Sequence, residues 1–407
     1  MRFAHFADIH LGAWREPKLQ ELNLETFKKA IGICIEEKVD FIIIAGDLFD
    51  TAMPPIEILK EAVSELKKLK DSGIGCYVIA GSHDFSVSGK TFLDVIEKAG
   101  LCKNVSLSSE QDMGNGDMLT VLETCEHDGC IFAGLPGKKG GLETRAFKNL
   151  QMHLPESKSK AKIFMMHTTL TEAKPKDLYF IESVDIEELP DGFDYYAGGH
   201  LHIVFESSRK GKPVVYPGPL FPNNFQELEE LKQGSFCIVD IGDGKCSIRK
   251  EKIKLKDVVP VSIDVSGMKP ELATEAIIKK ISEHEVKEKI LALKISGCID
   301  GKTSDMDFDR ITAAASECYA MLKNTNALTS SSMSIETHTQ SNNIQGIEDE
   351  IIKRYIKDEN EWDFIPFINT LMHLDMEKQE GETVAGFESR VNDEAIKILG
   401  LKERMER

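Results

Sequence analysis

Aspartate and histidine residues follow several short apolar segments in the first half of this 407-residue sequence. Such side chains can ligate metal ions, transfer protons or simply cap a turn. The residues in this position are Asp8, His10, Asp47, His83, Asp84, His167, His200 and His202. Each has an ordinary structural explanation when it is taken alone. The ordered series D-x-H, GD-x-x-D, G-x-H-D, H and GH-x-H strongly favours a metal centre instead.

The donor set indicates which ions and which reaction such a centre would serve. Two aspartates and four histidines suit two borderline divalent ions such as Mn²⁺, Fe²⁺ or Zn²⁺, because imidazole prefers transition metals to Mg²⁺ or Ca²⁺. The series contains no thiolate, which speaks against a structural zinc site. A carboxylate can bridge two ions about 3.5–4 Å apart, and such a pair holds the attacking and leaving oxygens of phosphoryl transfer. The pattern therefore predicts phosphoester hydrolysis.

Five apolar segments are expected to position these residues as β-strands. The expected strands cover residues 3–7, 41–45, 76–80, 163–166 and 195–197, and amphipathic helices are expected over 21–38 and 56–70. Continuous apolar strands separated by helices imply an α/β layered core that is covered on both sides. Ligands bind at the carboxyl ends of strands in open α/β sheets, so the Asp and His residues are expected to meet there.

The motifs resemble those of the calcineurin-like metallophosphoesterases, whose signature is D-x-H, GD-x-x-D, GNH[D/E] and GH-x-H. Three stretches are more specifically similar to the Mre-eleven/SbcD family of DNA repair nucleases. They are FADIHLG at 6–12, GDLFD at 46–50 with Pro54 and Pro55 behind it, and VYPGPL at 215–220. The resemblance implies a layered phosphoesterase core of β-sheets flanked by helices. A small α+β capping domain and a helical C-terminal segment would follow this core.

The resemblance also implies a role for each residue of the site. The first metal ion would be bound by Asp8, His10, Asp47 and His202. The second would be bound by Asp47 as a bridging ligand, with Ser82, His167 and His200. His83 would act as the general acid that protonates the leaving oxygen, and Asp50 would either orient it or only cap a turn. The expected cofactor is a pair of Mn²⁺ ions per chain.

Ser82 departs from the family pattern, which has asparagine before the catalytic histidine. A serine hydroxyl is a shorter and weaker ligand than an amide oxygen, so either a water fills the gap or the second ion binds loosely. Natural drift and an inactivating change are equally compatible with this residue. Pro219 in place of the usual serine is a smaller departure. Both departures bear on turnover rather than on the class of function.

Four regions are predicted along the chain. They are a nuclease domain at 1–250, a DNA-capping domain at 251–330, a polar linker at 331–345 and partner-binding helices at 346–407. Within the capping domain, strands are expected at 261–265 and 290–295, and helices at 270–283 and 308–322. Three apolar stripes in the last region predict three short helices.

Composition narrows the function classes further. The chain carries 50 basic and 68 acidic residues, a net charge of −18, which excludes a general binder of polyanions. DNA would therefore need local cations, for which Arg15, Lys18, Lys174 and Lys176 are the candidates. Nine scattered cysteines without a CxxC pair, no secretion signal and no membrane-length apolar run predict a cytoplasmic, nucleoid-associated protein with no membrane contact.

The leading hypothesis is a Mn²⁺-dependent DNA exonuclease and endonuclease that processes double-strand breaks. By resemblance, it would act on double-stranded DNA ends and hairpins, form a homodimer, and bind an SMC-like ABC ATPase of the Rad-fifty/SbcC type through residues 346–407. One alternative is a scaffold that tethers DNA or a partner, with catalysis weakened by Ser82. The other is a phosphodiesterase for small nucleotides, which would need neither the middle domain nor the tail.

Overall fold

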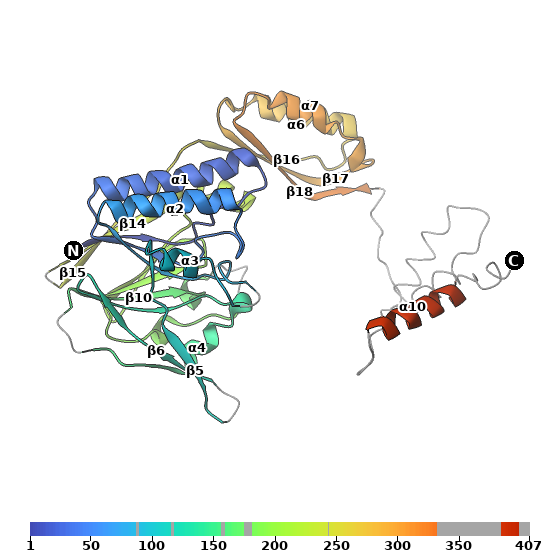
Figure 1. The fold of residues 1–407 in the computed structure, drawn as a ribbon. Helices are drawn as coiled ribbons and strands as arrows, with labels where there is room; N and C mark the ends of the chain where they lie inside the picture. Colours follow the sequence, from blue (N-terminus) through green and yellow to red (C-terminus); the bar gives the residue numbers. More distant parts are fainter. Residues whose placement is uncertain are drawn as a thin grey trace. The chain divides into compact units, whose positions relative to one another are not determined.

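The computed structural model describes residues 1–86, 89–114, 118–155, 159–174, 181–242, 244–331 and 384–398. The chain forms two compact units, Met1–Ser332 and Met333–Arg407. The first unit contains all of the sheets (Figure 1). In the second, α10 (Val384–Ile398) carries the third of the three apolar stripes predicted for the tail. The other two stripes lie outside the described residues.

Two six-stranded sheets form the centre of the first unit. The first has the order β15-β14-β1-β2-β3-β4, and the second has the order β12-β13-β11-β10-β8-β7. The strands of the first are β1 (Arg2–Phe6), β2 (Phe41–Ala45), β3 (Gly75–Ile79), β4 (Lys103–Asn104), β14 (Gly234–Gly242) and β15 (Lys245–Ile253). Those of the second are β7 (Cys125–His127), β8 (Cys130–Leu135), β10 (Ala161–His167), β11 (Tyr195–Gly199), β12 (Val204–Arg209) and β13 (Lys212–Pro217). In each sheet the central strands that carry the motifs run parallel.

The alternation of side chains along the strands explains why they are apolar on both faces. In β2, Phe41 and Ile43 pack into the core between the two sheets, whereas Ile42 and Ile44 pack under the helices. In β10, Ile163 and Met165 face the same inter-sheet core, and Phe164 belongs to a third cluster on the outer side of the second sheet. The fold is therefore a layered α/β sandwich of two sheets with helices outside, which confirms the expected fold class.

Two of the five outer helices were predicted from the sequence, and the other three were not. The five are α1 (Pro17–Glu36), α2 (Ile56–Asp71), α3 (Leu93–Lys98), α4 (Thr144–Lys148) and α5 (Phe225–Leu231). α1 begins four residues before the expected start, because Pro17 occupies the first helical turn, where a fixed φ and a missing N–H are favourable. Figure 1 shows α1 and α2 side by side over the first sheet. The short 3₁₀ helices are η1 (Lys139–Gly141), η2 (Thr171–Ala173), η4 (Ile186–Glu188) and η5 (Thr303–Asp305).

A small sheet that the sequence patterns did not predict lies beside α4. It has the order β5-β6-β9, formed by β5 (Ser108–Asp112), β6 (Met118–Leu122) and β9 (Leu150–Met152). Its first strand is exposed along its whole length, so no apolar alternation could reveal it.

The region after residue 257 is a separate three-stranded parallel sheet covered by two helices. Its elements are β16 (Val258–Asp264), α6 (Pro270–Ser282), β17 (Ile290–Ile299), α7 (Phe308–Ala314) and β18 (Ala320–Ser330). The expectation of one helix over 308–322 is wrong at its end, because α7 stops at Ala314 and residues 320–330 pair with β17. Among the described residues, no helix is long and apolar enough to cross a bilayer.

Candidate metal centre

The predicted ligands come from the carboxyl ends of strands in both large sheets. Asp8 and His10 follow β1, and Asp47 follows β2. His167 is the last residue of β10, and His200 comes directly after β11. The loops after β1 and β2 are joined by main-chain hydrogen bonds, in which the N–H groups of Ile9 and His10 both donate to the carbonyl oxygen of Asp47 (2.9 and 3.0 Å). The two sheets therefore bring distant residues to one edge.

Several of these residues have an unfavourable main-chain conformation. The φ angles of Asp8, His10, Asp47 and His202 lie between +47° and +51°, and that of His200 is +102°. A non-glycine residue in this region costs about 1–3 kcal/mol and persists only where the surrounding structure enforces it. Five such residues at one strand edge indicate that side-chain placement, rather than local stability, determines the geometry here.

The first cluster consists of Asp8, His10 and His202, whose ligand atoms lie within 4.8 Å of one another. The Nε2 atoms of His10 and His202 are 3.0 Å apart. On the other side of each ring, Nδ1 contacts a carboxylate: Asp50 Oδ1 at 3.2 Å from His10, and Glu227 Oε1 at 2.8 Å from His202. A carboxylate accepts the Nδ1 proton, which leaves both Nε2 lone pairs facing the same point. That is the arrangement of two imidazole ligands of one cation.

The second cluster consists of Asp8, Asp47 and His167, all fully buried. His167 Nδ1 donates to the carbonyl oxygen of Ala45 (2.9 Å), so Nε2 is the nitrogen left to ligate a cation. That Nε2 lies 3.0 Å from Asp47 Oδ2, which in turn is 3.5 Å from His10 Nε2. No hydrogen bond of good geometry joins these two atoms within the described part of the chain, although they lie at ion-pair distance. The carboxylate of Asp47 thus touches both clusters, as a bridging ligand must.

Glycines make room for these side chains. A Cβ atom on Gly81 would lie 2.2 Å from Asp47 Oδ1, and one on Gly46 would lie 2.1 Å from His167 Nδ1. Gly46 also has a φ of +91°, which only glycine adopts readily. The glycines of the motifs therefore act by allowing the ligands to approach the main chain closely.

The remaining predicted members of the second site are placed less tightly. His200 is absent from the three groups of described residues whose ligand atoms lie within 4.8 Å of one another. Its ring centroid lies 5.0 Å from that of His167, and its N–H donates to Asp8 Oδ1 (2.8 Å). Ser82 and His200 together line an open cavity of about 590 Å³ above the clusters.

His83 and Asp50 form the exposed edge of the centre. The N–H of His83 donates to Asp47 Oδ1 (2.8 Å), and its Nδ1 contacts the main-chain oxygen of Asp50 (2.7 Å). Asp50 therefore contacts His83 through its main-chain carbonyl oxygen, not through the side chain as expected. The Asp50 carboxylate contacts His10.

Two acidic residues of the site were not assigned a role from the sequence. Asp84 is buried and accepts main-chain N–H groups of Gly81, Leu48 and Phe49 (2.9, 3.3 and 3.1 Å), which ties the loop after β3 to the loop after β2. Glu227 holds His202 from the first turn of α5, where Asn224 is the N-cap. The spacing of Asn224 and Glu227 is a helix-start signal, but nothing local links it to a histidine 25 residues earlier.

The charges of the buried groups are strongly coupled. Burial alone would raise the pKa of Asp47, but the imidazoles of His167 and His10 hold that pKa well below its usual range. For His167, burial alone would lower the pKa, but the carboxylates of Asp47 and Asp8 raise it to about 10. Burial and the repulsion of His167 lower the pKa of His200 to about 3. Buried carboxylates that attract a positive charge this strongly fit a cation site made of nitrogen and oxygen donors.

The cations predicted to hold DNA are only partly available for it. Lys18 donates to the main-chain oxygen of Tyr319, and Lys174 donates to Ile181 O and Ser183 Oγ. Arg15 is exposed, and Lys176 lies outside the described residues. Lys18 and Lys174 therefore already form hydrogen bonds within the protein.

Comparisons with known proteins agree with this geometry. A protein similar over 256 residues, with 29% identity, is the "DNA double-strand break repair protein Mre11" of Methanopyrus kandleri, matched over 60% of this chain and 55% of that protein. The proteins of the same name from Archaeoglobus fulgidus and Thermoplasma acidophilum are 27% and 26% identical. The matches cover 65% and 85% of this chain, and 59% and 96% of those proteins. The chain thus spans a little over half the length of the first two relatives.

The family model that matches the chain covers residues 1–204. This range contains the ligand-bearing strands β1, β2, β10 and β11 and all the predicted ligands. By this match and by its buried Asp and His clusters, the chain belongs to the calcineurin-like phosphoesterase family.

Proposed function

We propose that this phosphoesterase is a Mn²⁺-dependent DNA exonuclease and endonuclease that processes double-strand breaks. The observation that carries the proposal is Asp47, whose buried carboxylate lies between His10 of one cluster and His167 of the other, with His83 at the exposed edge. The names of the relatives, all repair proteins of double-strand breaks, support DNA over small nucleotides as the substrate.

The metal pair would be held by Asp8, His10, Asp47 and His202 at one position, and by Asp47, Ser82, His167 and His200 at the other. When bound, such a pair polarises a phosphodiester and activates water for in-line attack. The choice of Mn²⁺ over Mg²⁺ is supported by the four imidazoles, which transition metals prefer.

The residues around this pair have tasks of their own. Asp50 and Glu227 fix the rings of His10 and His202 through their Nδ1 atoms, so each Nε2 is presented as a lone pair. The Asp50 carbonyl fixes His83 through Nδ1, which leaves Nε2 as the nitrogen that can carry a proton to the leaving oxygen. His83 lines the open cavity, so a phosphodiester that lies over the clusters would be within its reach.

A second candidate is a scaffold with weakened catalysis, and Ser82 favours it. The position that the family fills with an amide ligand has only a hydroxyl here, and His200, its partner in that site, stands outside the tight clusters. The rest of the proposal follows the resemblance: DNA ends and hairpins as substrates, an SMC-like Rad-fifty-type ATPase as partner, a homodimer, and a cytoplasmic, nucleoid-associated location.

The test compares two substrates on the full chain. With Mn²⁺, both linear duplex DNA and bis(p-nitrophenyl) phosphate should be hydrolysed, and EDTA should abolish both reactions. His83→Ala should lower the rate about 10²–10⁴-fold without loss of bound Mn²⁺. Ser82→Asn should raise activity, most at limiting Mn²⁺.

The outcomes separate the three candidate functions. Hydrolysis of the small phosphodiester without cleavage of DNA would identify a phosphodiesterase of small nucleotides. No hydrolysis by either the natural chain or Ser82→Asn would identify the scaffold. His153→Ala, at an exposed histidine outside the centre, is the control for His83→Ala.

A further inference from the structure

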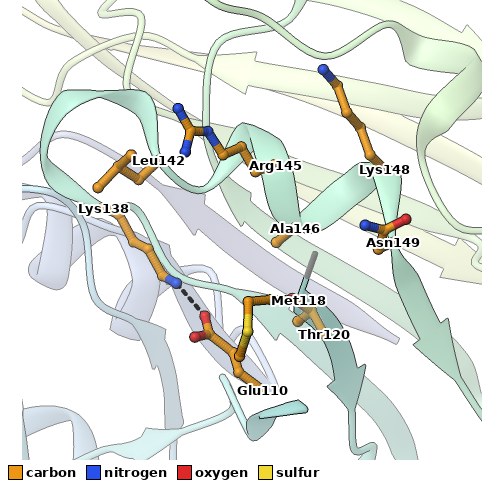
Figure 2. A pocket seen from close by; sticks show the side chains of 9 residues that line it. All are labelled: Glu110, Met118, Thr120, Lys138, Leu142, Arg145, Ala146, Lys148 and Asn149. Atoms are coloured by element: carbon orange, nitrogen blue, oxygen red, sulfur yellow. Dashed lines mark hydrogen bonds and ion pairs between the residues drawn. The ribbon is translucent and has the colours of Figure 1, made fainter. Parts of the chain in front are cut away.

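A second cavity lies beside the metal centre and is used by none of the steps above. It measures about 480 Å³ and is bounded by β5, β6, α4 and the segment that leads into α4. Figure 2 shows Lys138, Arg145 and Lys148 along one side of it, with Glu110 and Met118 opposite. We call it the α4 groove.

The α4 groove has a positive charge in a strongly negative chain. Three cations line it, and the one acidic residue of its lining, Glu110, forms an ion pair with Lys138 at 2.5 Å. Arg145 and Lys148 stand three residues apart on one face of α4, both exposed, and form no ion pair within the described part of the chain. In a chain of net charge −18, two neighbouring cations without an ion pair are available to an anionic ligand.

The α4 groove and the cavity over the metal centre share one lining residue, Lys138. That cavity, of about 590 Å³, is also lined by Ser82, His83 and His200. The junction is held rigidly by buried Glu143, which accepts the N–H of Lys138 (3.1 Å) and the hydroxyl of Thr168 (3.1 Å). Thr168 directly follows His167, so the wall of the groove is attached to a predicted ligand.

The size and lining of the α4 groove identify the class of ligand. A cavity of a few hundred Å³ accepts one or two nucleotides but not the width of a duplex. A strand bound without sequence preference needs cations for its phosphates and flat or apolar surface for its bases. Met118 and Leu142, 44% and 50% exposed, supply the apolar surface on the rim.

We propose that the α4 groove binds the phosphates of an unpaired nucleic-acid strand that continues from the scissile phosphate past Lys138 to Arg145 and Lys148. This inference rests on the proposed nuclease function and adds to it a place where the strand leaves the metal centre. It implies that DNA must be locally unpaired beside the cleaved bond, because only a single strand fits the groove.

The test replaces the two unpaired cations in the full chain. Arg145→Gln/Lys148→Gln should weaken binding of a fluorescent oligothymidylate in EDTA about tenfold at low salt. The slope of log K against log salt should become shallower by about 1.4, since each lost phosphate contact to a single strand contributes about 0.7. With Mn²⁺, KM for the oligonucleotide should rise, while hydrolysis of bis(p-nitrophenyl) phosphate should stay unchanged.

Two further variants serve as controls. Lys29→Gln/Lys98→Gln removes the same charge at exposed positions that line neither cavity, and it should leave binding unchanged. Glu110→Gln removes the acidic residue of the groove and should tighten binding about twofold, which misfolding could not imitate.

The result that overturns the inference is equal oligothymidylate binding by the Arg145/Lys148 variant and the Lys29/Lys98 control. If the natural chain hydrolyses neither substrate but the Arg145/Lys148 variant still loses affinity, the nuclease proposal falls and the α4 groove stands. The two proposals therefore fail by different measurements.

Discussion

At the scale of single residues, the centre depends on which nitrogen of each imidazole is left free. His10, His202 and His167 each have Nδ1 occupied by an acceptor, namely a carboxylate, a carboxylate and a main-chain oxygen. When a cation is bound, each ring would be held in the tautomer whose Nε2 carries the lone pair. The acceptors are therefore as necessary to the metal centre as the imidazoles themselves.

Glu227→Ala should weaken metal binding at the first site about 10–100-fold, because His202 loses the partner that orients its ring. Calorimetric titration of the chelator-treated protein with Mn²⁺ measures the effect. Glu230→Ala is the matched control in the same helix, since Glu230 is exposed and accepts a hydrogen bond from Gln226 rather than holding a histidine. Equal affinities of the two variants would contradict the positioning role of Glu227.

His5 predicts how stability depends on pH. It is fully buried next to the Tyr195 hydroxyl (3.0 Å), and burial lowers its pKa to about 3. The unfolded chain binds the proton near the ordinary value of 6.5, so stability is lost as pH falls from about 6.5 towards 3, by up to about 4 kcal/mol. His5→Asn cannot ionise and should flatten this acid limb in urea unfolding, whereas His153→Asn, at an exposed position, should not. An unchanged limb in His5→Asn would refute the argument.

At the scale of elements, strands with a clear apolar pattern could be predicted, and exposed or polar strands could not. β2 and β10 are buried on both faces, and their ends are marked by Asp47 and His167, so pattern and chemistry agree. β5 is exposed throughout. The first residues of β18 were expected to end a helix, because this strand is held by its pairing with β17 and has no clear apolar pattern of its own. The division into two sheets also depends on tertiary pairing, which no single segment encodes.

Tyr319, next to the first residue of β18, contacts Lys18 of α1 and thereby joins the sheet β16-β17-β18 to the phosphoesterase core. Lys18 donates to its main-chain oxygen, and the ammonium groups of Lys18 and Lys256 lie 5.4 and 4.4 Å from its ring centroid. Tyr319→Ala should lower the free energy of unfolding by about 1–2 kcal/mol and speed amide exchange at the start of β18. Tyr319→Phe keeps the ring and should retain most of the stability. Identical exchange in the alanine variant and the natural chain would show that other contacts hold the sheet in place.

At the scale of the whole molecule, the net charge is negative, like that of the proposed DNA substrate, and much of it lies in the C-terminal tail. Residues 346–407 contain 9 basic and 16 acidic side chains, so the tail holds −7 of the net −18. A polyanion is repelled by this tail at long range. Among the described residues, the metal-ligand groups and the α4 groove lie in the first unit, Met1–Ser332. The tail's apolar stripes are better suited to a protein partner.

Deletion of residues 346–407 should therefore separate two activities. The shortened chain, with a net charge of −11 (−18 less −7), should keep Mn²⁺-dependent cleavage of short DNA and bind DNA at least as tightly as the full chain. It should no longer co-purify with an SMC-like ATPase of the Rad-fifty type, because the apolar helices predicted there would dock on that partner. Parallel pull-down and nuclease assays on the two chains measure both properties. Full-strength capture of the ATPase by the shortened chain would move the docking surface into the first unit, and loss of cleavage would give the tail a part in the metal centre.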